Sequence, residues 1–244
     1  MTTARKTPMT TALEHHLQRQ VEHSRDFFWH RVRWKAVREQ LPRDRPFTLL
    51  DVGAGVGLLG DYLAEVPGGT YRFTEPIPEL EARLEARWGK DANLRDREAY
   101  DGVDVVTLLD VAEHIEDDHA FLGDLAAKMP AGATLVMTVP AMASLWSYWD
   151  EALDHYRRYD KAMLRALFAP LPLEVREVSY LFPEMVPAAL LRRRRTRTPS
   201  TDAAEFPDLP RPVNRAFERL GTATLRLRRA WPVGTSALVV AVRR

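Results

Sequence analysis

A glycine-rich turn constrains this chain more than any other feature of its sequence. Glycines at positions 53, 55 and 57 lie between an apolar segment at 47–52 and a helical pattern at 58–64. Glycine lets the main chain approach a ligand closely, and the first turn of the following helix offers unpaired N–H groups. This predicted strand, turn and helix would bind a nucleotide-like cofactor.

The spacing of the glycines narrows the choice of cofactor. The helix start lacks the Gly-Lys-Ser/Thr of a phosphate-binding loop, and a dinucleotide fingerprint would place its glycines as G-x-G-x-x-G. The observed D-x-G-x-G-x-G resembles motif I of the class I S-adenosylmethionine-dependent methyltransferases. That resemblance implies cofactor contacts at Asp51, Gly53, Ala54, Gly55 and Gly57. An ordinary strand-to-helix turn is the alternative interpretation.

Length and composition favour one α/β domain over residues 1–244. The 244 residues suffice for a single core, and the absence of cysteine excludes disulfides, thiolate metal sites and a cysteine nucleophile. We see no apolar run near the roughly 20 residues that span a bilayer and no signal peptide in 1–11, so we expect a cytoplasmic protein. After Leu190 the chain has 13 Arg against 4 acidic residues, although its net charge is +1.

Apolar segments alternate with helical patterns along the chain, which predicts a doubly wound parallel sheet. We expect strands at 47–52, 70–74, 92–94, 103–109, 134–139, 173–180 and 235–242. The core would comprise 47–180 and 233–244, with an insertion at 181–232 that covers the substrate. A helix at 12–41, rich in bulky residues such as Trp29, would pack on the sheet or close over the ligands.

Acidic residues follow several of the expected strands, at the edge where ligands bind in open α/β sheets. Glu75, about 20 residues after the glycines, is placed to accept hydrogen bonds from both hydroxyls of a ribose. Asp96 would meet an adenine amino group, and Asp110 ends the fourth strand. A surface glutamate before a helix N-terminus is the alternative for Glu75.

Further motifs resemble the ubiquinone-biosynthesis-like methyltransferases over roughly residues 25–244. They are 102–106 with 110–118 (GVDVV and DVAEHIEDD), 130–132 (PAG), 139–141 (VPA), 145–147 (LWS), 150–152 (DEA), 155–159 (HYRRY) and 232–236 (PVGTS). The resemblance implies a seven-stranded sheet of order 3-2-1-4-5-7-6 with the last strand antiparallel. It also implies that Gly53, Glu75, Arg33 and the backbone of Leu109 contact S-adenosylmethionine, which leaves as S-adenosylhomocysteine. Thr74-Glu75-Pro76 departs from the Asp-x-Ser usual there, so neighbouring contacts differ.

Methyl transfer requires alignment of an acceptor with an activated donor, and a general base where the acceptor is a hydroxyl or a protonated amine. His155 is our candidate base, and His114 is an alternative. Acceptor contacts are expected from Trp29 of the N-terminal helix and from the aromatic and basic residues around His155, which are Trp146, Tyr148, Trp149, Tyr156, Arg158 and Tyr159. Alternatively, His155 and Asp154 hold this loop, while Arg157 and Arg158 pair with Asp150 or Glu151.

Asp110, Glu113 and His114 form D-x-x-E-H. In ubiquinone-type O-methyltransferases a similar E-x-x-E-H carries a divalent metal, and positions i, i+3 and i+4 share one helical face. The same residues would also cap the following helix and pair locally. We expect no metal here.

The basic tail has three interpretations. Apolar residues at 181–191 precede Arg192–Arg195 and Arg197, a pattern that suits an anionic membrane surface, a phosphate-bearing acceptor, or a helix docked on the core. We find no recognisable nucleic-acid module. The sequence predicts a methyltransferase that acts on oxygen or nitrogen of a small molecule in secondary or lipid-linked metabolism. An RNA methyltransferase and a non-catalytic S-adenosylmethionine-binding partner are the alternatives.

Overall fold

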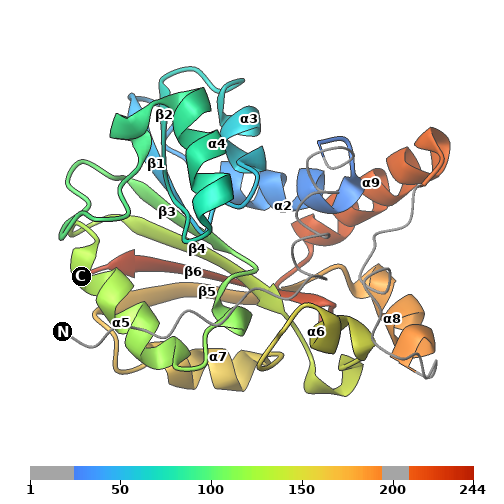
Figure 1. Ribbon diagram of the computed structural model, residues 1–244. Helices are drawn as coiled ribbons and strands as arrows, with labels where there is room; N and C mark the ends of the chain where they lie inside the picture. The colour runs from blue at the N-terminus through green and yellow to red at the C-terminus, as the bar shows by residue number, and fades with distance from the viewer. Residues whose placement is uncertain (1–24, 194–208) are drawn as a thin grey trace.

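A single mixed β-sheet organises the protein. The computed structural model describes residues 25–193 and 209–244 (Figure 1). Its strands are β1 (Phe47–Val52), β2 (Gly69–Thr74), β3 (Val105–Leu109), β4 (Thr134–Pro140), β5 (Leu173–Leu181) and β6 (Ser236–Arg243). The described residues form six strands in the order β2-β1-β3-β4-β6-β5. Neighbours among β1 to β4 are parallel, and β6 is antiparallel to both β4 and β5. The antiparallel last strand is confirmed.

The expected strand at 92–94 does not form. Lys90–Ala92 is a short 3-10 helix, and only one parallel bridge joins Asn93 to Phe73 of β2. The Asn93 side chain donates to Glu81 and Glu85 of α4 (Pro78–Trp88), and so ties this segment to the helix. Without a continuous ladder the described sheet has six strands, although the bridge lies at the edge where the seventh was expected.

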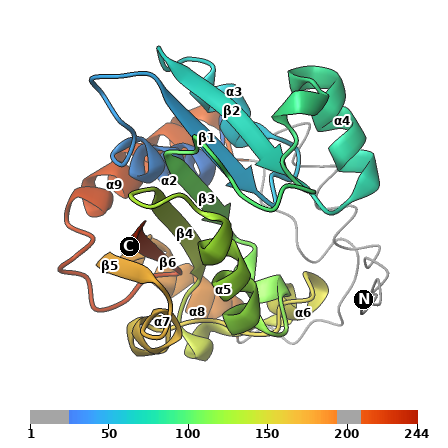
Figure 2. The ribbon, with the colours of Figure 1, turned by 90° about the vertical axis from the view of Figure 1, so that its left-hand side faces the viewer.

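Helices cover both faces of the sheet (Figures 1 and 2). On one face lie α2 (Phe28–Arg38), α3 (Leu58–Leu63), α4 and α9 (Arg211–Arg226). On the other lie α5 (Asp118–Lys128) and α7 (Lys161–Phe168). Successive strand residues alternate between the two apolar cores, so Leu49 packs with the first group and Leu50 with the second. Burial on both faces explains why β1, β3 and β4 are almost continuously apolar.

The expected insertion forms two helices, α8 (Val186–Arg193) and α9, and residues 194–208 lie outside the described part. Helix α9 packs along α2, where Lys35 donates to Glu218 at 2.8 Å and Asn214 accepts from the backbone of Phe28 at 2.9 Å. The expected N-terminal helix is described only from residue 25 onward. No helix within 25–193 or 209–244 is long and apolar enough to cross a bilayer.

Candidate active site

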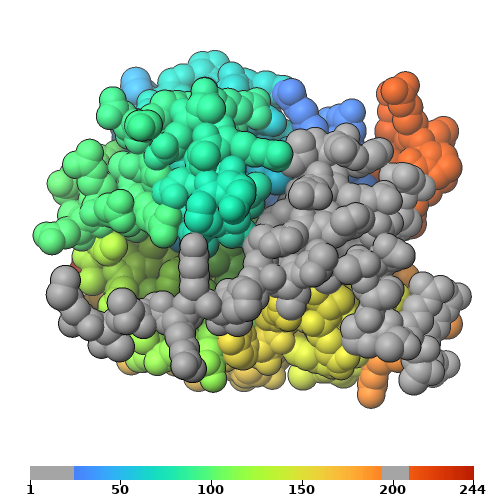
Figure 3. All heavy atoms as spheres, in the orientation of Figure 1, coloured from blue at the N-terminus to red at the C-terminus, as the bar shows by residue number. Residues whose placement is uncertain are grey.

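A cavity of about 740 Å³ opens at the carboxyl ends of the parallel strands. Its wall combines α2, the glycine turn after β1, the segment after β3, α6 (Tyr148–Ala152), α8 and the start of β6. In the space-filling view, the segment after β4 (yellow) lies below the α3–α4 region (green to cyan) on this side of the molecule (Figure 3). The volume lies within the roughly 300–1,000 Å³ typical of small-molecule pockets.

The glycine turn contributes Gly53, Ala54 and Gly55 to the cavity wall, but Gly57 serves another purpose. Gly57 has φ +77° at the start of α3, and a Cβ there would lie 2.6 Å from Leu84 and Trp88 of α4. Gly53 has φ +70°, and a Cβ at this position would lie 2.7 Å from the side chain of Val111. Glycine at position 57 therefore lets α3 pack against α4. Gly57 does not line the cavity, so the expected cofactor contact of this residue has no support in the geometry.

Glu75 points at the glycine turn. One carboxylate oxygen accepts the N–H of Gly55 at 2.7 Å, and the other accepts that of Ile77 at 2.9 Å. The side chain is 2% exposed, and burial raises its pKa to about 7 despite these two bonds. Glu75 is outside the cavity lining itself. Each oxygen has a second lone pair, so the carboxylate retains acceptor capacity next to the turn.

Asp51 lies at the cavity floor, at the end of β1. Thr107 donates to it at 2.9 Å and the hydroxyl of Tyr71 at 3.1 Å, while burial raises its pKa to about 6. Asp51 therefore joins β1 to both neighbouring strands and also lines the cavity.

Arg33 and Asp110 form an ion pair inside the cavity. Asp110 also accepts from Thr138 at 3.2 Å and has φ +57°, while Arg33 lies 3.1 Å from His30 Nδ1. Leu109 lines the cavity beside them. The structure thus brings Arg33 next to Leu109 and Asp110, although Arg33 and Asp110 are 77 residues apart in the sequence.

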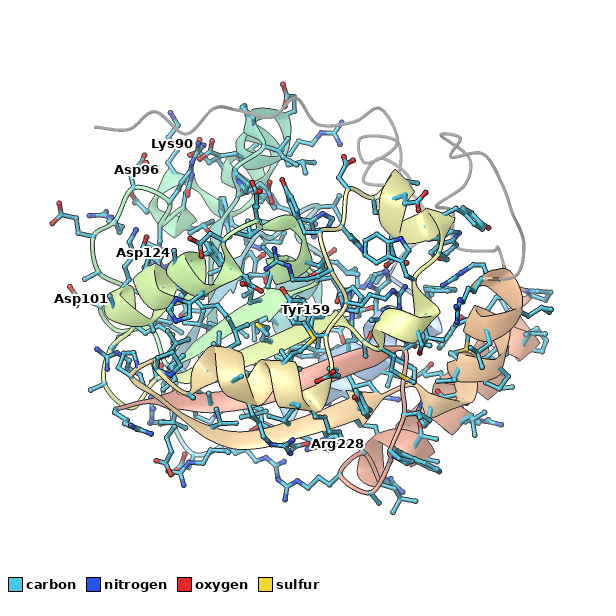
Figure 4. The ribbon with its side chains drawn as sticks, turned by 90° about the horizontal axis from the view of Figure 1, so that it is seen from below. Lys90, Asp96, Asp101, Asp124, Tyr159 and Arg228 are labelled. Carbon is cyan, nitrogen blue, oxygen red and sulfur yellow. The ribbon has the colours of Figure 1, made fainter. Side chains whose placement is uncertain are left out.

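Asp96 does not reach this place. It is exposed and outside the cavity lining, and Figure 4 shows it at the rim of the molecule near Lys90. The expected contact with adenine therefore has no support in the geometry. Leu94 still donates its N–H to the carbonyl of Phe73 in β2, and the turn that begins at Leu94 leaves Asp96 exposed.

His155 is oriented by a buried carboxylate. Its Nδ1 lies 3.0 Å from Asp150, which also accepts Arg158 Nε at 2.7 Å. Burial alone would raise the pKa of Asp150, but the hydrogen bond from His155 and the charge of Arg158 hold it below its usual value. An ionised carboxylate only accepts, so Nδ1 carries the hydrogen and a neutral His155 has its lone pair on Nε2. The expected pairing of Arg158 with Asp150 is present, whereas Arg157 pairs with Asp118 at 2.8 Å.

The expected acceptor residues divide into two groups. Trp29, Tyr148, Trp149 and Arg158 line the cavity, and Trp146, Tyr156 and Tyr159 do not. Tyr159 is buried in the core, where its hydroxyl donates to Asp118 at 2.8 Å (Figure 4). Tyr156 is 50% exposed, and Trp146 donates to Glu151. These last three side chains therefore stabilise the loop or face solvent, which corrects their assignment to the acceptor.

A metal-compatible cluster occurs in the described residues, with a different membership from the one expected. Glu113, His114 and His155 each offer a donor atom, and these atoms lie within 4.8 Å of one another. Asp110, the expected third member, is engaged by Arg33. Glu113 is fully buried and neither of its oxygens has a hydrogen-bond partner, and burial with the nearby Asp110 raises its pKa well above the usual value. These donors fit a divalent cation, so the absence of a metal stays an untested prediction.

Arg192, part of the basic cluster for which the sequence leaves three interpretations open, lines the cavity. It comes from α8, and its guanidinium lies 4.1 Å from the ring centroid of Trp149. Its neighbour Arg193 is exposed and donates to the carbonyl of Ser144 at 2.9 Å. Arg194, Arg195 and Arg197 lie outside the described residues. The signal in the sequence was the apolar run before Arg192, which predicts a helix docked against the core.

Comparison with known proteins agrees with this geometry. A family model described as a methyltransferase domain matches residues 13–178. The ubiquinone biosynthesis O-methyltransferase of Paramagnetospirillum magneticum is 34% identical over 117 residues, which are 42% of this chain and 46% of that protein. The chain thus aligns with about half the length of this curated relative.

Solved structures share the fold at low sequence identity. A chain of the complex between the Haloferax volcanii Trm112 methyltransferase activator and a methyltransferase aligns with a TM-score of 0.60 and 17% identity, over 97% of this chain and 99% of that one. Phosphoethanolamine N-methyltransferase 2 of Haemonchus contortus, solved with S-adenosyl-L-methionine, aligns with a TM-score of 0.58 and 15% identity. The alignment covers 88% of this chain and 52% of that one. Geranyl diphosphate C-methyltransferase of Streptomyces coelicolor A3(2), solved with Mg²⁺ and S-adenosyl-L-homocysteine, aligns with a TM-score of 0.57 and 14% identity. The alignment covers 87% of this chain and 75% of that one.

The sheet order, the glycine turn and the cavity at the strand ends define a class I S-adenosylmethionine-dependent methyltransferase. The chain belongs to the family of that methyltransferase domain, whose model covers more than half of it.

Proposed function

We propose that this protein transfers the methyl group of S-adenosylmethionine to an oxygen of a small-molecule acceptor, with His155 as the general base. The observation that carries this proposal is the Asp150–His155 pair in the same cavity as the glycine turn. A hydroxyl acceptor needs a base, and Nε2 of a neutral His155 supplies one. The relative from Paramagnetospirillum magneticum is named an O-methyltransferase, which favours oxygen over nitrogen.

The cofactor would bind along the glycine turn. Gly53 to Gly55 would allow close approach of the main chain, and Glu75 behind Gly55 would accept the ribose hydroxyls. Arg33 and Asp110 would face the charged amino acid end, because both line the cavity and carry opposite charges. When bound, S-adenosylmethionine supplies a methyl group activated by its sulfonium.

The chain's own residues would then align and deprotonate the acceptor. Trp29 and Trp149 line the cavity on separate elements, so a flat acceptor would be held between apolar surfaces. Nε2 of His155 would take the proton of the acceptor hydroxyl when the acceptor oxygen receives the methyl group. Asp150 would stabilise the imidazolium that results, which would release the proton to water before the next turnover.

Three measurements test this proposal. Calorimetry with S-adenosylmethionine and S-adenosylhomocysteine should show binding of both, and absence of binding at millimolar concentration would overturn the cofactor assignment. A screen for transfer of labelled methyl groups into cell-extract fractions should then find an acceptor. Turnover should fall at least 100-fold in His155→Ala with little change in cofactor affinity. A non-catalytic binding partner would bind the cofactor and label no fraction.

A further inference from the structure

Arg192 has an unusual position for a cation. The central carbon of its guanidinium lies 4.1 Å from the centroid of the Trp149 ring, and the side chain lines the cavity from α8. Its Nε atom is buried and has no hydrogen-bond partner, and no acidic side chain of the described chain forms an ion pair with it. A buried guanidinium donor without an acceptor is costly, and native structures normally satisfy it with protein, water or ligand.

The carboxylates near Arg192 are already committed. Asp150 is within electrostatic reach, but its oxygens serve His155, Arg158 and the N–H of Ser147. Arg158 is also close and adds a like charge. Asp110 is paired with Arg33. Among the described residues, the cavity end formed by α6 and α8 therefore has more positive than negative charge.

The surroundings of Arg192 would strengthen a bond to an anion. Trp149 and Tyr148 from α6 and Ala188 and Ala189 from α8 line the same part of the cavity, so little water would compete. Burial also lowers the pKa of Arg192 from its very high usual value, although a guanidinium stays protonated. Arginine binds carboxylate and phosphate through parallel N–H groups, with bonds about twice as strong as neutral ones.

We propose that the methyl acceptor carries an anionic oxyacid group, a phosphate or a carboxylate, and that Arg192 binds it while Trp149 orients the guanidinium. The inference deepens the proposed function and rests on it, because it assigns this end of the cavity to the acceptor. The acceptor is then an amphiphile whose apolar or aromatic body lies among the tryptophans and whose acidic end reaches α8.

The test compares small probes of matched shape. Phenyl phosphate, benzoate and the neutral benzamide are titrated into the full chain saturated with S-adenosylhomocysteine, and binding is followed by ligand-observed NMR. Wild-type protein should bind at least one anionic probe about tenfold more tightly than benzamide. The better of the two anions distinguishes phosphate from carboxylate recognition.

Variants at two adjacent arginines provide the control. Arg192→Met keeps an unbranched side chain on Trp149 and should reduce the preference for the anion to less than twofold. Arg192→Lys keeps the charge and should recover part of it. Arg193→Met, on the same helix but exposed, should leave the preference unchanged. All variants should bind S-adenosylhomocysteine within twofold of wild type, which shows that the cavity is intact.

The outcomes separate the two proposals. Equal or undetectable binding of all three probes by the wild type, or an equal loss in Arg193→Met, would overturn the assignment of Arg192. Failure of the wild type to bind S-adenosylhomocysteine would instead overturn the proposed function. The probes would then be titrated without it, so that the anion site is judged separately.

Discussion

Glu75 combines burial, a backbone contact to the glycine turn and a pKa raised to about 7. If its ionised form accepts the ribose hydroxyls, binding favours loss of its proton. Affinity for S-adenosylhomocysteine should therefore rise between pH 5.5 and 7 and level off above, because the ionised carboxylate is the stronger acceptor. Glu75→Gln should bind at least tenfold more weakly at pH 8, and its affinity should vary less with pH.

Calorimetry across this pH range checks the prediction. Glu79→Gln is the matched control, because Glu79 is exposed in the first turn of α4 and should behave as wild type. Unchanged affinity in Glu75→Gln would show that the ribose lies elsewhere.

The same carboxyl group makes a prediction about the ligand-free protein. Its folded pKa of about 7 exceeds the usual 4.5, so the folded state holds the proton more tightly than the unfolded state. The stability from this group is complete below pH 4.5 and is lost as the pH rises toward 7. At about 1.4 kcal/mol per pH unit, the loss amounts to at most about 3 kcal/mol.

Urea unfolding at pH 5 and pH 8 measures this effect. Wild type should lose more free energy of unfolding between the two values than Glu75→Gln, whose amide does not titrate. The difference between the losses measured for wild type and for Glu75→Gln removes the contributions of other titrating groups, such as Asp51 with its pKa of about 6. A parallel pH dependence in both proteins would mean that Glu75 titrates near its usual value.

At the scale of elements, the turn after β1 joins a strand to a helix that must pack against α4. Gly57→Ala places a methyl group 2.6 Å from Leu84 and Trp88 and keeps a left-handed φ of +77°. We expect a loss of about 2–5 kcal/mol in the free energy of unfolding, from overpacking of about 1–3 kcal/mol together with backbone strain of about 1–2 kcal/mol.

Gly102→Ala separates these two causes. Gly102 has a similar φ of +74°, but a Cβ there meets nothing within 4 Å. Its substitution should cost only the strain, about 1–2 kcal/mol, in the same urea titration. Equal losses in the two variants would refute the packing role of Gly57.

Most elements could be predicted from the sequence because their signals are local. The strands at 47–52 and 134–139 are buried on both faces, and a short continuous apolar run is typical of a central strand in a parallel sheet. The segment 92–94 shows the limit of this reasoning. Its side chains allow a strand, but the hydrogen bonds of Asn93 to α4 hold it in a different path.

The site was predictable to the extent that its residues follow strands. Gly53, Leu109 and Asp110 lie at strand ends, so the topology alone brings them to the cavity. Arg192 and the buried position of Asp150 depend on how α8 and α6 dock, which no short motif encodes. Tyr159 shared a motif with His155 yet packs into the core, where its hydroxyl donates to Asp118, and the motif does not encode this contact between distant segments.

At the scale of the whole molecule, the cavity joins parts of the chain that do not otherwise form one unit. Helix α2 contributes Trp29 and Arg33, the sheet contributes the glycine turn, and the insertion contributes Arg192. Between α2 and α9, Lys35 and Arg31 pair with Glu218 at 2.8 and 3.1 Å. A ligand that touches all these walls would bind the folded state alone, so its binding energy adds to the stability of the fold.

Thermal unfolding provides the measurement for this linkage. At a concentration of S-adenosylhomocysteine 100 times its Kd, the stabilisation is about 2.7 kcal/mol, which for a chain of this size raises Tm by roughly 5–10 °C. In Glu75→Gln a tenfold weaker Kd at the same concentration gives about half of that stabilisation, and Glu79→Gln should match wild type. If calorimetry detects binding but Tm does not change, the unfolded chain binds the ligand as well as the folded chain does. That result would contradict a site that only the folded chain assembles.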